Sequence, residues 1–183
     1  IRPGKDGKLF RMYKFRSMTD ERDAEGNLLP DDVRLTEFGK KLRATSADEL
    51  PELINIFKGD MSVVGPRPQL VRDMVFFTKE EMKRQSVYPG LTGLAQICGR
   101  NNITWKEKFA FDLQYIKDIS FLEDMRIIFR TVFKVSAQED IATDGMETAE
   151  DYGDWLLRTR QIEKEEYDKK QAEAKKMLDE FKG

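Results

Sequence analysis

The spacing of hydrophobic residues along the chain predicts a fold made mostly of helices. Apolar residues recur at helical intervals, flanked by helix start and stop signals, in segments 34–46, 48–58, 72–85, 104–117, 120–135 and 161–182. Strand-like runs are fewer: the aromatic-rich segment 8–18, which follows the turn signal KDG, and the short apolar run 61–65. Polar segments with glycine and proline predict loops at 19–32 and 88–102. The pattern therefore predicts a compact, helix-rich α+β domain with a small β-hairpin and short strands.

Local signals set several of these helix ends. Thr104 and Glu107 have the spacing of a capping box, in which each side chain bonds the backbone of the other, and Ser120 and Glu123 repeat that spacing. Gly59 follows the last apolar residue of the 48–58 segment, where a glycine commonly ends a helix. We therefore expect helices to begin just after Thr104 and Ser120, and one to end at Gly59.

The helix predicted over 120–135 carries basic and apolar residues together. Its basic residues Arg126, Arg130 and Lys134 recur at every fourth position. The apolar residues beside them are Met125, Phe129, Val132 and Phe133. Two interpretations are equally consistent with this pattern. The segment is either a core helix with a basic outer face or an amphipathic helix that lies on an anionic membrane surface.

The chain divides into a domain over 1–140 and a charged linker with a C-terminal helix over 141–183. The tail has few apolar positions, and Met177, Leu178 and Phe181 are the ones near its end. Such positions suggest packing onto the domain or onto a partner, while the high charge also allows a solvated extension.

Composition excludes several kinds of chemistry. The 183 residues include 32 basic and 34 acidic ones, a net charge of −2 that gives no general attraction to nucleic acid. No histidine is present, which excludes a Ser-His-Asp triad, a Cys-His pair and a histidine-ligated metal. Any metal must then be held by oxygen ligands, which favours magnesium, manganese or calcium over zinc. The single cysteine cannot form an intrachain disulfide, and it indicates a reducing compartment.

Membrane and targeting signals are sparse. No apolar run approaches the roughly 18 residues needed to span a bilayer, and no signal peptide is visible. The chain opens with IRPGKDG, without an initiator methionine and at what reads as the middle of a hairpin. We therefore expect a fragment from which an upstream part has been removed, so a soluble or peripheral fragment would say little about the whole protein.

Two adjacent carboxylates, Asp48 and Glu49, stand where a helix is expected to start, because Pro51 fits only near a helix N-terminus. Acidic residues there most often do no more than satisfy free backbone N–H groups and the helix dipole. Adjacent helical residues, however, point about 100° apart, so two carboxylates can serve two tasks. One could attack a phosphorus atom while the other holds Mg²⁺ against the same phosphates.

Arg67 lies between two prolines, Pro66 and Pro68. An arginine in a turn is common, and prolines often edge a strand. Both prolines nevertheless restrict the backbone around Arg67, which lowers the entropy lost when its guanidinium is presented to a ligand. A guanidinium binds phosphate oxygens in a bidentate way, so Arg67 is a candidate phosphate clamp.

Four sequence blocks, read together, resemble a known family. YKFRSM, ADELPELINIFKGDMSVVGPRPQ, PGLTGLAQICGRN and FDLQYIKDISFLEDMRII occur in the order and spacing of the bacterial sugar transferases, the monotopic phosphoglycosyl transferases. The resemblance covers about residues 1–135 and leaves the tail out. It implies a catalytic domain that lacks the family's N-terminal membrane segment and acts at the cytoplasmic face of the bacterial inner membrane.

The resemblance also implies a reaction. A sugar-1-phosphate would pass from a nucleoside diphosphate sugar, by family habit a UDP-sugar, to polyprenyl (undecaprenyl) phosphate, beginning a bacterial surface glycan or glycoconjugate. Asp48 would be the nucleophile that carries the phosphosugar, and Glu49 would be the ligand of Mg²⁺. The other positions that match functional residues of the family are Lys14, Arg43, Arg67, Arg100 and Asp112.

Two other classes of function remain open from the sequence. The first is a non-catalytic module that binds a nucleotide sugar or recruits a partner for glycan assembly. The second is a carboxylate-based phosphatase, which would need water to reach the phospho-aspartate. The intact Asp48, Glu49 and Arg67 favour the transferase over the binding module, and no residue that would activate water stands out.

Overall fold

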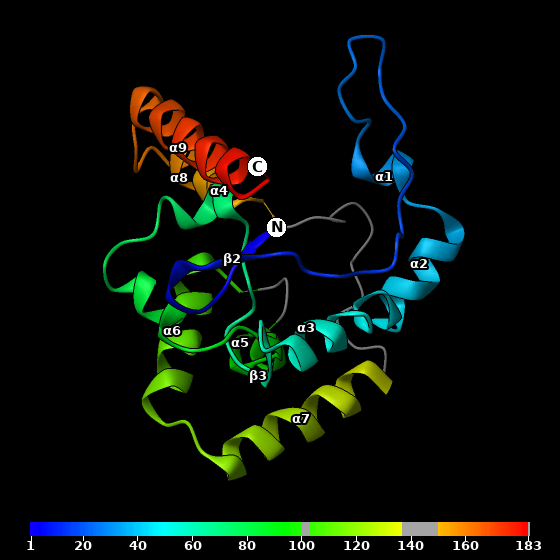
Figure 1. The fold of residues 1–183 in the computed structure, drawn as a ribbon, viewed down its shortest axis with the longest axis vertical. Helices are drawn as coiled ribbons and strands as arrows, with labels where there is room; N and C mark the ends of the chain where they lie inside the picture. Colours follow the sequence, from blue (N-terminus) through cyan, green and yellow to red (C-terminus); the bar gives the residue numbers. More distant parts are fainter. Residues whose placement is uncertain (100–102, 137–149, 183) are drawn as a thin grey trace.

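The computed structural model describes residues 1–99, 103–136 and 150–182. Short strands and several helices make up a helix-rich α+β domain (Figure 1). The strands are β1 Arg2–Pro3, β2 Leu9–Phe10, β3 Ser62–Val64 and β4 Gly90–Thr92. The α-helices are α1 Asp31–Arg34, α2 Glu37–Ala44, α3 Glu52–Lys58, α4 Val71–Met74, α5 Leu94–Gly99, α6 Trp105–Lys117, α7 Phe121–Ser136, α8 Tyr152–Arg158 and α9 Lys164–Lys182. The 3-10 helices are η1 Lys5–Gly7, η2 Ala47–Glu49 and η3 Glu81–Ser86.

The strands form two separate pairs. β1 and β2 make the predicted antiparallel hairpin through η1. β3 and β4 run parallel, with Ser62 opposite Gly90 and Val64 opposite Thr92. A glycine is required at Gly90, because a Cβ there would lie 2.1 Å from the backbone nitrogen of Gly65. This close approach brings the end of β3, and the Pro66–Pro68 turn after it, directly against β4.

The predicted helix ends are confirmed. Thr104 and Glu107 form both bonds of the capping box that opens α6. The Ser120 hydroxyl accepts the backbone N–H of Glu123 at the start of α7. Gly59 ends α3 in the left-handed conformation, with a φ of 79°.

The strand expected over 8–18 is wrong beyond Phe10, because a side chain replaces the missing strand partner. The Asn55 side chain accepts the backbone N–H of Tyr13 at 3.0 Å and donates to the carbonyl of Arg11 at 2.7 Å. Further along, the Phe15 N–H donates to the carbonyl of Asp48 at 2.9 Å. The segment after β2 is thereby held against η2 and α3 as extended chain.

The single helix expected over 72–85 is also wrong. α4 ends at Met74, and the 3-10 helix η3 follows from Glu81. A second start signal lies between them, since the Thr78 N–H donates to Glu81 and the Thr78 hydroxyl accepts the Glu81 N–H. This reciprocal pair favours a new helical start over continuation of the first helix.

Two clusters of buried side chains form the core, and α6 contributes to both. The first cluster joins α4, α6, α8 and α9 and includes Val71, Trp105 and Tyr152. The second lies between β3, α5, α6 and α7 and includes Tyr115 and Ile127. α6 therefore ties the strand pair to the C-terminal helices (Figure 1).

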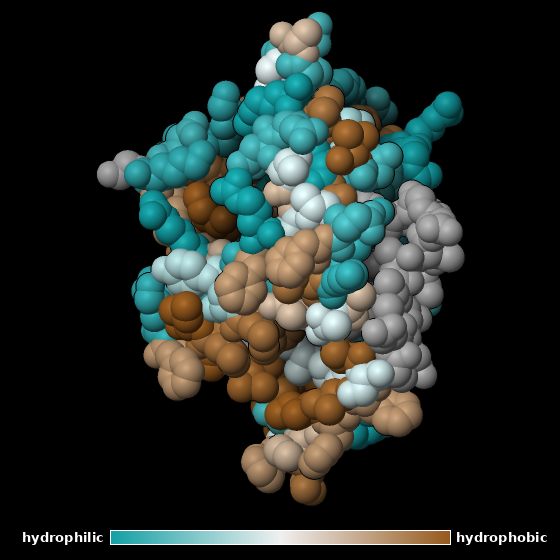
Figure 2. All heavy atoms as spheres, turned by 90° about the vertical axis from the view of Figure 1, so that its right-hand side faces the viewer, coloured by the Kyte–Doolittle hydropathy of each residue, from teal (hydrophilic) through white to brown (hydrophobic). Residues whose placement is uncertain are grey.

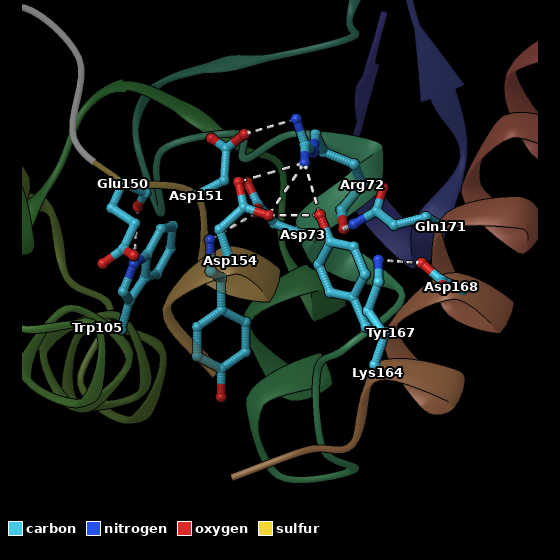
Figure 3. Close-up of polar contacts among 11 residues, drawn as sticks. Arg72, Asp73, Trp105, Glu150, Asp151, Asp154, Lys164, Tyr167, Asp168 and Gln171 are labelled. Atoms are coloured by element: carbon cyan, nitrogen blue, oxygen red, sulfur yellow. Dashed lines mark hydrogen bonds and ion pairs between the residues drawn. The ribbon is translucent and has the colours of Figure 1, made fainter. Parts of the chain in front are cut away.

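The C-terminal helices pack onto the domain. Ala174 of α9 is buried in the first cluster, and Met177 and Leu178 pack against it, so the expected packing onto the domain is confirmed for these residues. Polar contacts add to this packing. The guanidinium of Arg72, on α4, pairs with the carboxylates of Asp151 and Asp154 and donates to the Tyr167 hydroxyl, at 3.1–3.3 Å (Figure 3). The proposed division at residue 140 lies outside the described residues and stays a prediction.

Many apolar side chains of α3 and α7 face outward. We call them the apolar face, and it consists of Leu50, Leu53, Ile54, Phe57, Phe121, Leu122, Phe129, Val132 and Phe133, each at least 42% exposed. In Figure 2, hydrophobic residues gather over the lower half of the side that includes α7. One of the two interpretations of 120–135 is an ordinary core helix. That interpretation is wrong for the exposed apolar residues of α7, because Ile127 is the residue of this helix that is buried. Within the described ranges, no helix is both long and apolar enough to cross a membrane.

Candidate active site

The two adjacent carboxylates lie on the 3-10 turn η2, not on the first turn of an α-helix as predicted. Ser46 adopts the left-handed conformation, with a φ of 54°, and its carbonyl accepts the N–H of Glu49 at 3.2 Å. α3 begins only at Glu52, with Pro51 as its N-cap residue. The sharp turn at Ser46 follows the end of α2 and brings η2 against the segment after β2, whose Phe15 N–H donates to the backbone carbonyl of Asp48.

Glu49 is held between two cations. Lys14 Nζ donates to Glu49 Oε1 at 2.7 Å, and Arg67 contacts both carboxylate oxygens, with Nη1 at 3.4 Å from Oε2. Burial of Glu49 opposes ionisation, but Arg67 and then Lys14 outweigh it and hold the pKa at about 2. Glu49 is therefore ionised at neutral pH.

Asp48 has a different environment. Its side chain is buried, and within the described part of the chain it has no hydrogen bond or ion pair with another side chain. Burial and then the charge of Glu49 raise its pKa above 3.8, while Lys14 and Arg43 act in the opposite direction. One carboxylate of the pair is thus neutralised by cations, and its neighbour keeps its oxygens available for chemistry.

Glu52 was missed by the sequence reasoning and belongs to the same cluster. It is 1% exposed, and its Oε1 lies 3.3 Å from Lys14 Nζ without forming a hydrogen bond. Burial raises its pKa. The signal was available, because residues three apart on a helical segment share a face, and Glu52 follows Glu49 by three.

Backbone contacts on both sides hold Arg67 in place. The Pro66 carbonyl accepts the N–H of Gly90 at 3.1 Å, and the carbonyl of Arg67 accepts a bond from Arg84 Nη2 at 2.6 Å. The Arg67 side chain is 37% exposed. Arg67 is therefore fixed at its backbone, with its charged end against Glu49.

Asp112 lies under this turn and not on an exposed helix face. Its Oδ2 accepts Arg84 Nε at 2.9 Å and lies 2.8 Å from Arg84 Nη2. Both side chains are buried, at 3–4% exposure. The exposed position weighed for Asp112 from the sequence is wrong, and Arg84 was missed because nothing local distinguishes it within the charged run 79–84. Since Arg84 also bonds the carbonyl of Arg67, Asp112 is connected to Arg67 through Arg84.

Replacing Asp112 by alanine is expected to lower the free energy of unfolding by about 3–5 kcal/mol, because the buried Arg84 loses its counter-charge. Urea denaturation measures the change. Gln114→Ala is the matched control, since Gln114 is exposed on the same helix, and its effect should stay within about 0.5 kcal/mol. Equal losses in the two variants would show that the pair does not stabilise this site.

Of the two remaining predicted site residues, Arg43 is described by the structure and Arg100 is not. Arg43 lies on α2, where its Nε donates to Ser17 Oγ at 3.1 Å, and its charge lowers the pKa of Asp48. Arg100 lies outside the described residues, so its role stays a prediction. The structure thus brings Lys14, Arg43 and Arg67 around the carboxylate pair and places Asp112 behind Arg67.

The residues present fit a magnesium ion. In the described ranges no three potential ligands form a ready-made metal cluster. Mg²⁺, however, commonly takes one or two protein carboxylates and completes its shell with substrate phosphates and water. Glu49 is ionised, and Glu52 Oε1 has no hydrogen bond. These hard oxygen donors suit Mg²⁺, with Glu49 as the predicted protein ligand.

Comparisons with known proteins found a matching family model and several relatives. Residues 1–138 match the family model described as bacterial sugar transferase. The chain is 51% identical to the sugar transferase EpsL of Bacillus subtilis over 82% of its own length and 74% of that protein. It is 43% identical to the UDP-glucose:undecaprenyl-phosphate glucose-1-phosphate transferase of Klebsiella pneumoniae, over 73% of this chain and 31% of that protein. With the undecaprenyl-phosphate galactose phosphotransferase of Salmonella typhimurium it shares 36% identity, over 76% of this chain and 33% of that protein.

The match differs in extent among these relatives. The chain spans about three quarters of the Bacillus protein but only about a third of the Klebsiella and Salmonella proteins. The residues of the candidate site, from Lys14 to Asp112, all fall inside the matched range.

Proposed function

Because the chain belongs to the bacterial sugar transferase family, we propose that it transfers a sugar-1-phosphate from a UDP-sugar to undecaprenyl phosphate. The product would begin a bacterial surface glycan or glycoconjugate. The observation that carries the proposal is the asymmetric carboxylate pair. Asp48 keeps its oxygens available, while Glu49 is bound by Lys14 and Arg67.

In the first half-reaction, a carboxylate oxygen of Asp48 attacks the β-phosphorus of the donor. A bond forms between that oxygen and phosphorus, and the bond from phosphorus to the oxygen bridging the two phosphates breaks. UMP leaves with the electron pair, and the sugar phosphate stays on Asp48 as an acyl phosphate. No general base is needed, because the nucleophile is already a carboxylate, which agrees with the absence of histidine.

In the second half-reaction, a phosphate oxygen of the polyprenyl phosphate attacks the same phosphorus. The bond from phosphorus to Asp48 breaks, and the carboxylate is regenerated. The product is a polyprenyl diphosphate sugar. The two steps use one site in turn, so Lys14, Arg43 and Arg67 would serve two successive polyphosphate ligands.

Positive charge is the main contribution of the protein to both steps, because negative charge is spread over the phosphoryl oxygens in the transition state. Arg67 is held at its backbone and presents its guanidinium without large entropy loss. Mg²⁺ bound at Glu49 would neutralise further charge on the diphosphate. Asp112 pairs with Arg84, and Arg84 bonds the carbonyl of Arg67, so both residues position Arg67 and do not touch the substrate in this proposal.

The apolar face suits a membrane surface, where the lipid acceptor is found. α7 carries Arg126 and Arg130 beside its exposed apolar residues, and anionic lipids of the cytoplasmic leaflet attract such cations. We propose that the domain docks there through α3 and α7 (Figure 2).

Incubation with Mg²⁺ and a panel of UDP-sugars, first without lipid, tests this function. UMP release together with an intact-mass increase equal to one sugar phosphate is the expected result, followed by loss of the adduct when undecaprenyl phosphate is added. Donor binding without an adduct would favour a nucleotide-sugar-binding module. Release of inorganic phosphate or free sugar phosphate without lipid would favour a phosphatase.

The rate of the first half-reaction should fall at acid pH through the titration of Asp48. Its pKa is raised above 3.8 by burial and by Glu49. Only the carboxylate attacks, so the rate is full above this raised pKa and is lost as the pH falls through it. Glu49, with a pKa of about 2, stays ionised and adds no second acid limb. Single-turnover UMP release across pH measures the midpoint.

The variant Glu49→Gln tests whether Asp48 is the group that controls the rate at acid pH. Removing the neighbouring charge, and freeing Lys14 and Arg67 to face Asp48, should lower the pKa of Asp48 and move the acid limb of the residual activity to lower pH. A limb that stays in place, or moves to higher pH, would show that a group other than Asp48 controls it.

A further inference from the structure

A cavity of about 360 Å³ lies between the turn that contains η2, the β3–β4 pair, α5 and α7. Glu49 lines one part of it. Its apolar wall consists of Leu50, Val63, Leu91, Ile97, Ile128, Val132 and Val135. The cavity therefore connects the candidate active site to an apolar interior that the proposed phosphoryl chemistry does not use.

We infer that this cavity binds the isoprene units next to the phosphate of the polyprenyl phosphate acceptor. The inference rests on the proposed function and adds to it the place where the acceptor's hydrocarbon lies. Three features of the cavity support it.

The first feature is that most polar groups in the cavity wall already have hydrogen-bond partners within the protein. Thr92 Oγ1 and Thr131 Oγ1 bond each other at 2.6 Å, and Gln96 Nε2 donates to the carbonyl of Leu91 at 3.1 Å. Gln96 Oε1 is left as an unbonded buried acceptor. Of the other polar residues in the lining, Thr45 Oγ1 donates to the carbonyl of Lys41 at 3.1 Å, and Ser46 and Lys134 also have partners within the protein. A sugar or a base brings several polar groups, and most of them would lose water and find a wall whose polar groups are already bonded. A hydrocarbon chain carries no such cost, so the wall favours a prenyl group over the donor.

The second feature is the position of the cavity. At one side it reaches Glu49, which Lys14 and Arg67 bind, so a phosphate beside these cations would have its hydrocarbon at the cavity. At the other side its lining includes Leu50 and Val132, which belong to the exposed apolar face (Figure 2). A lipid that arrives along that face can thus place its phosphate at the site without exposing its chain to water.

The third feature is size. Small-molecule sites occupy about 300–1,000 Å³, and this cavity lies at the lower end of that range. It can hold only the part of a long polyprenyl chain nearest the phosphate, and the rest would lie on the apolar face. Acceptors of different chain length should therefore depend equally on the cavity.

Val132→Gln and Val63→Gln test the inference. Both side chains line the cavity yet are 60% and 43% exposed, so the substitutions leave the fold intact, which thermal unfolding checks. Val33→Gln is the matched control: it makes the same change at a residue of α1 that is 57% exposed, lies outside the apolar face and does not line the cavity. The full-length protein is assayed in detergent, which removes the contribution of membrane docking.

Each cavity variant should raise the KM for geranylgeranyl phosphate and for undecaprenyl phosphate by about fivefold to tenfold, because a polar group replaces apolar contact with the chain. Single-turnover UMP release, which needs no lipid, should be unchanged, and Val33→Gln should match the wild type in both assays. An unchanged acceptor KM in both cavity variants would overturn the inference, and slowed UMP release would assign the cavity to the donor instead. A wild-type protein that releases no UMP with any donor would refute the proposed function itself, and the inference with it.

Discussion

Asp48→Asn is expected to abolish the covalent sugar-phosphate adduct and to lower transfer to lipid by at least about a thousandfold. The amide has nearly the shape of the carboxylate but cannot attack phosphorus. Within the described ranges the Asp48 carboxylate has no hydrogen bond or ion pair with another side chain, so the substitution breaks no contact between side chains. Intact mass after incubation with donor, together with UMP release, measures the effect.

Two controls separate this effect from general damage. Asp118→Asn makes the same chemical change at an exposed residue after α6 and should leave the adduct in place. Glu49→Gln should weaken donor use but still permit some adduct, because the nucleophile remains. An adduct of full yield in Asp48→Asn would place the nucleophile elsewhere, and so would an adduct that disappears only in Glu49→Gln.

Removal of residues 150–183 is expected to unfold the domain or to cost about 5 kcal/mol of stability or more, although residues beyond 138 lie outside the family match. Tyr152 and Leu156 are core residues, and each contributes about 1.5–3 kcal/mol through burial. Their loss also uncovers Val71 and Trp105 in the same cluster. Since whole domains are stable by only about 5–15 kcal/mol, urea denaturation should show an early or absent transition.

A matched pair of substitutions on α9 tests the same contact without deleting chain. Ala174 is 1% exposed in the first core cluster, and Ala172 is exposed on the same helix. Ala174→Asp buries an unpaired charge and should destabilise by several kcal/mol, while Ala172→Asp should stay within about 0.5 kcal/mol. If the two variants were equally stable, α9 would not be docked on α4 in solution.

The C-terminal contact also concerns Asp73 (Figure 3). It accepts the N–H of Tyr152 at 2.8 Å, and burial with the nearby Asp151 raises its pKa to about 6. The residue thus lies where α4 and α8 meet, and it takes up a proton more readily in the folded protein than an exposed aspartate does.

Much of the fold could be predicted because its signals are local. The capping box of Thr104, the cap at Ser120 and the glycine at Gly59 involve bonds within a few residues, and the structure has all three. The hairpin of β1 and β2 follows from its KDG turn in the same way. Where the prediction failed, a distant side chain intervened. Asn55 bonds the backbone of residues 11 and 13, more than forty positions away, and no local pattern contains that information.

The candidate site shows the same difference between local signals and long-range contacts. The adjacent carboxylates, the arginine between prolines and the resemblance that points to Lys14 and Arg43 can all be recognised from local sequence. Contacts between distant elements were needed to show that Arg67 meets Glu49, that Glu52 joins the cluster, and that Asp112 is buried against Arg84. The physical reason is that charge, burial and pairing depend on elements brought together by the β3–β4 pair and by α6. The exposed apolar face was likewise decided by packing, because an amphipathic pattern shows which residues share a side but not whether that side is covered.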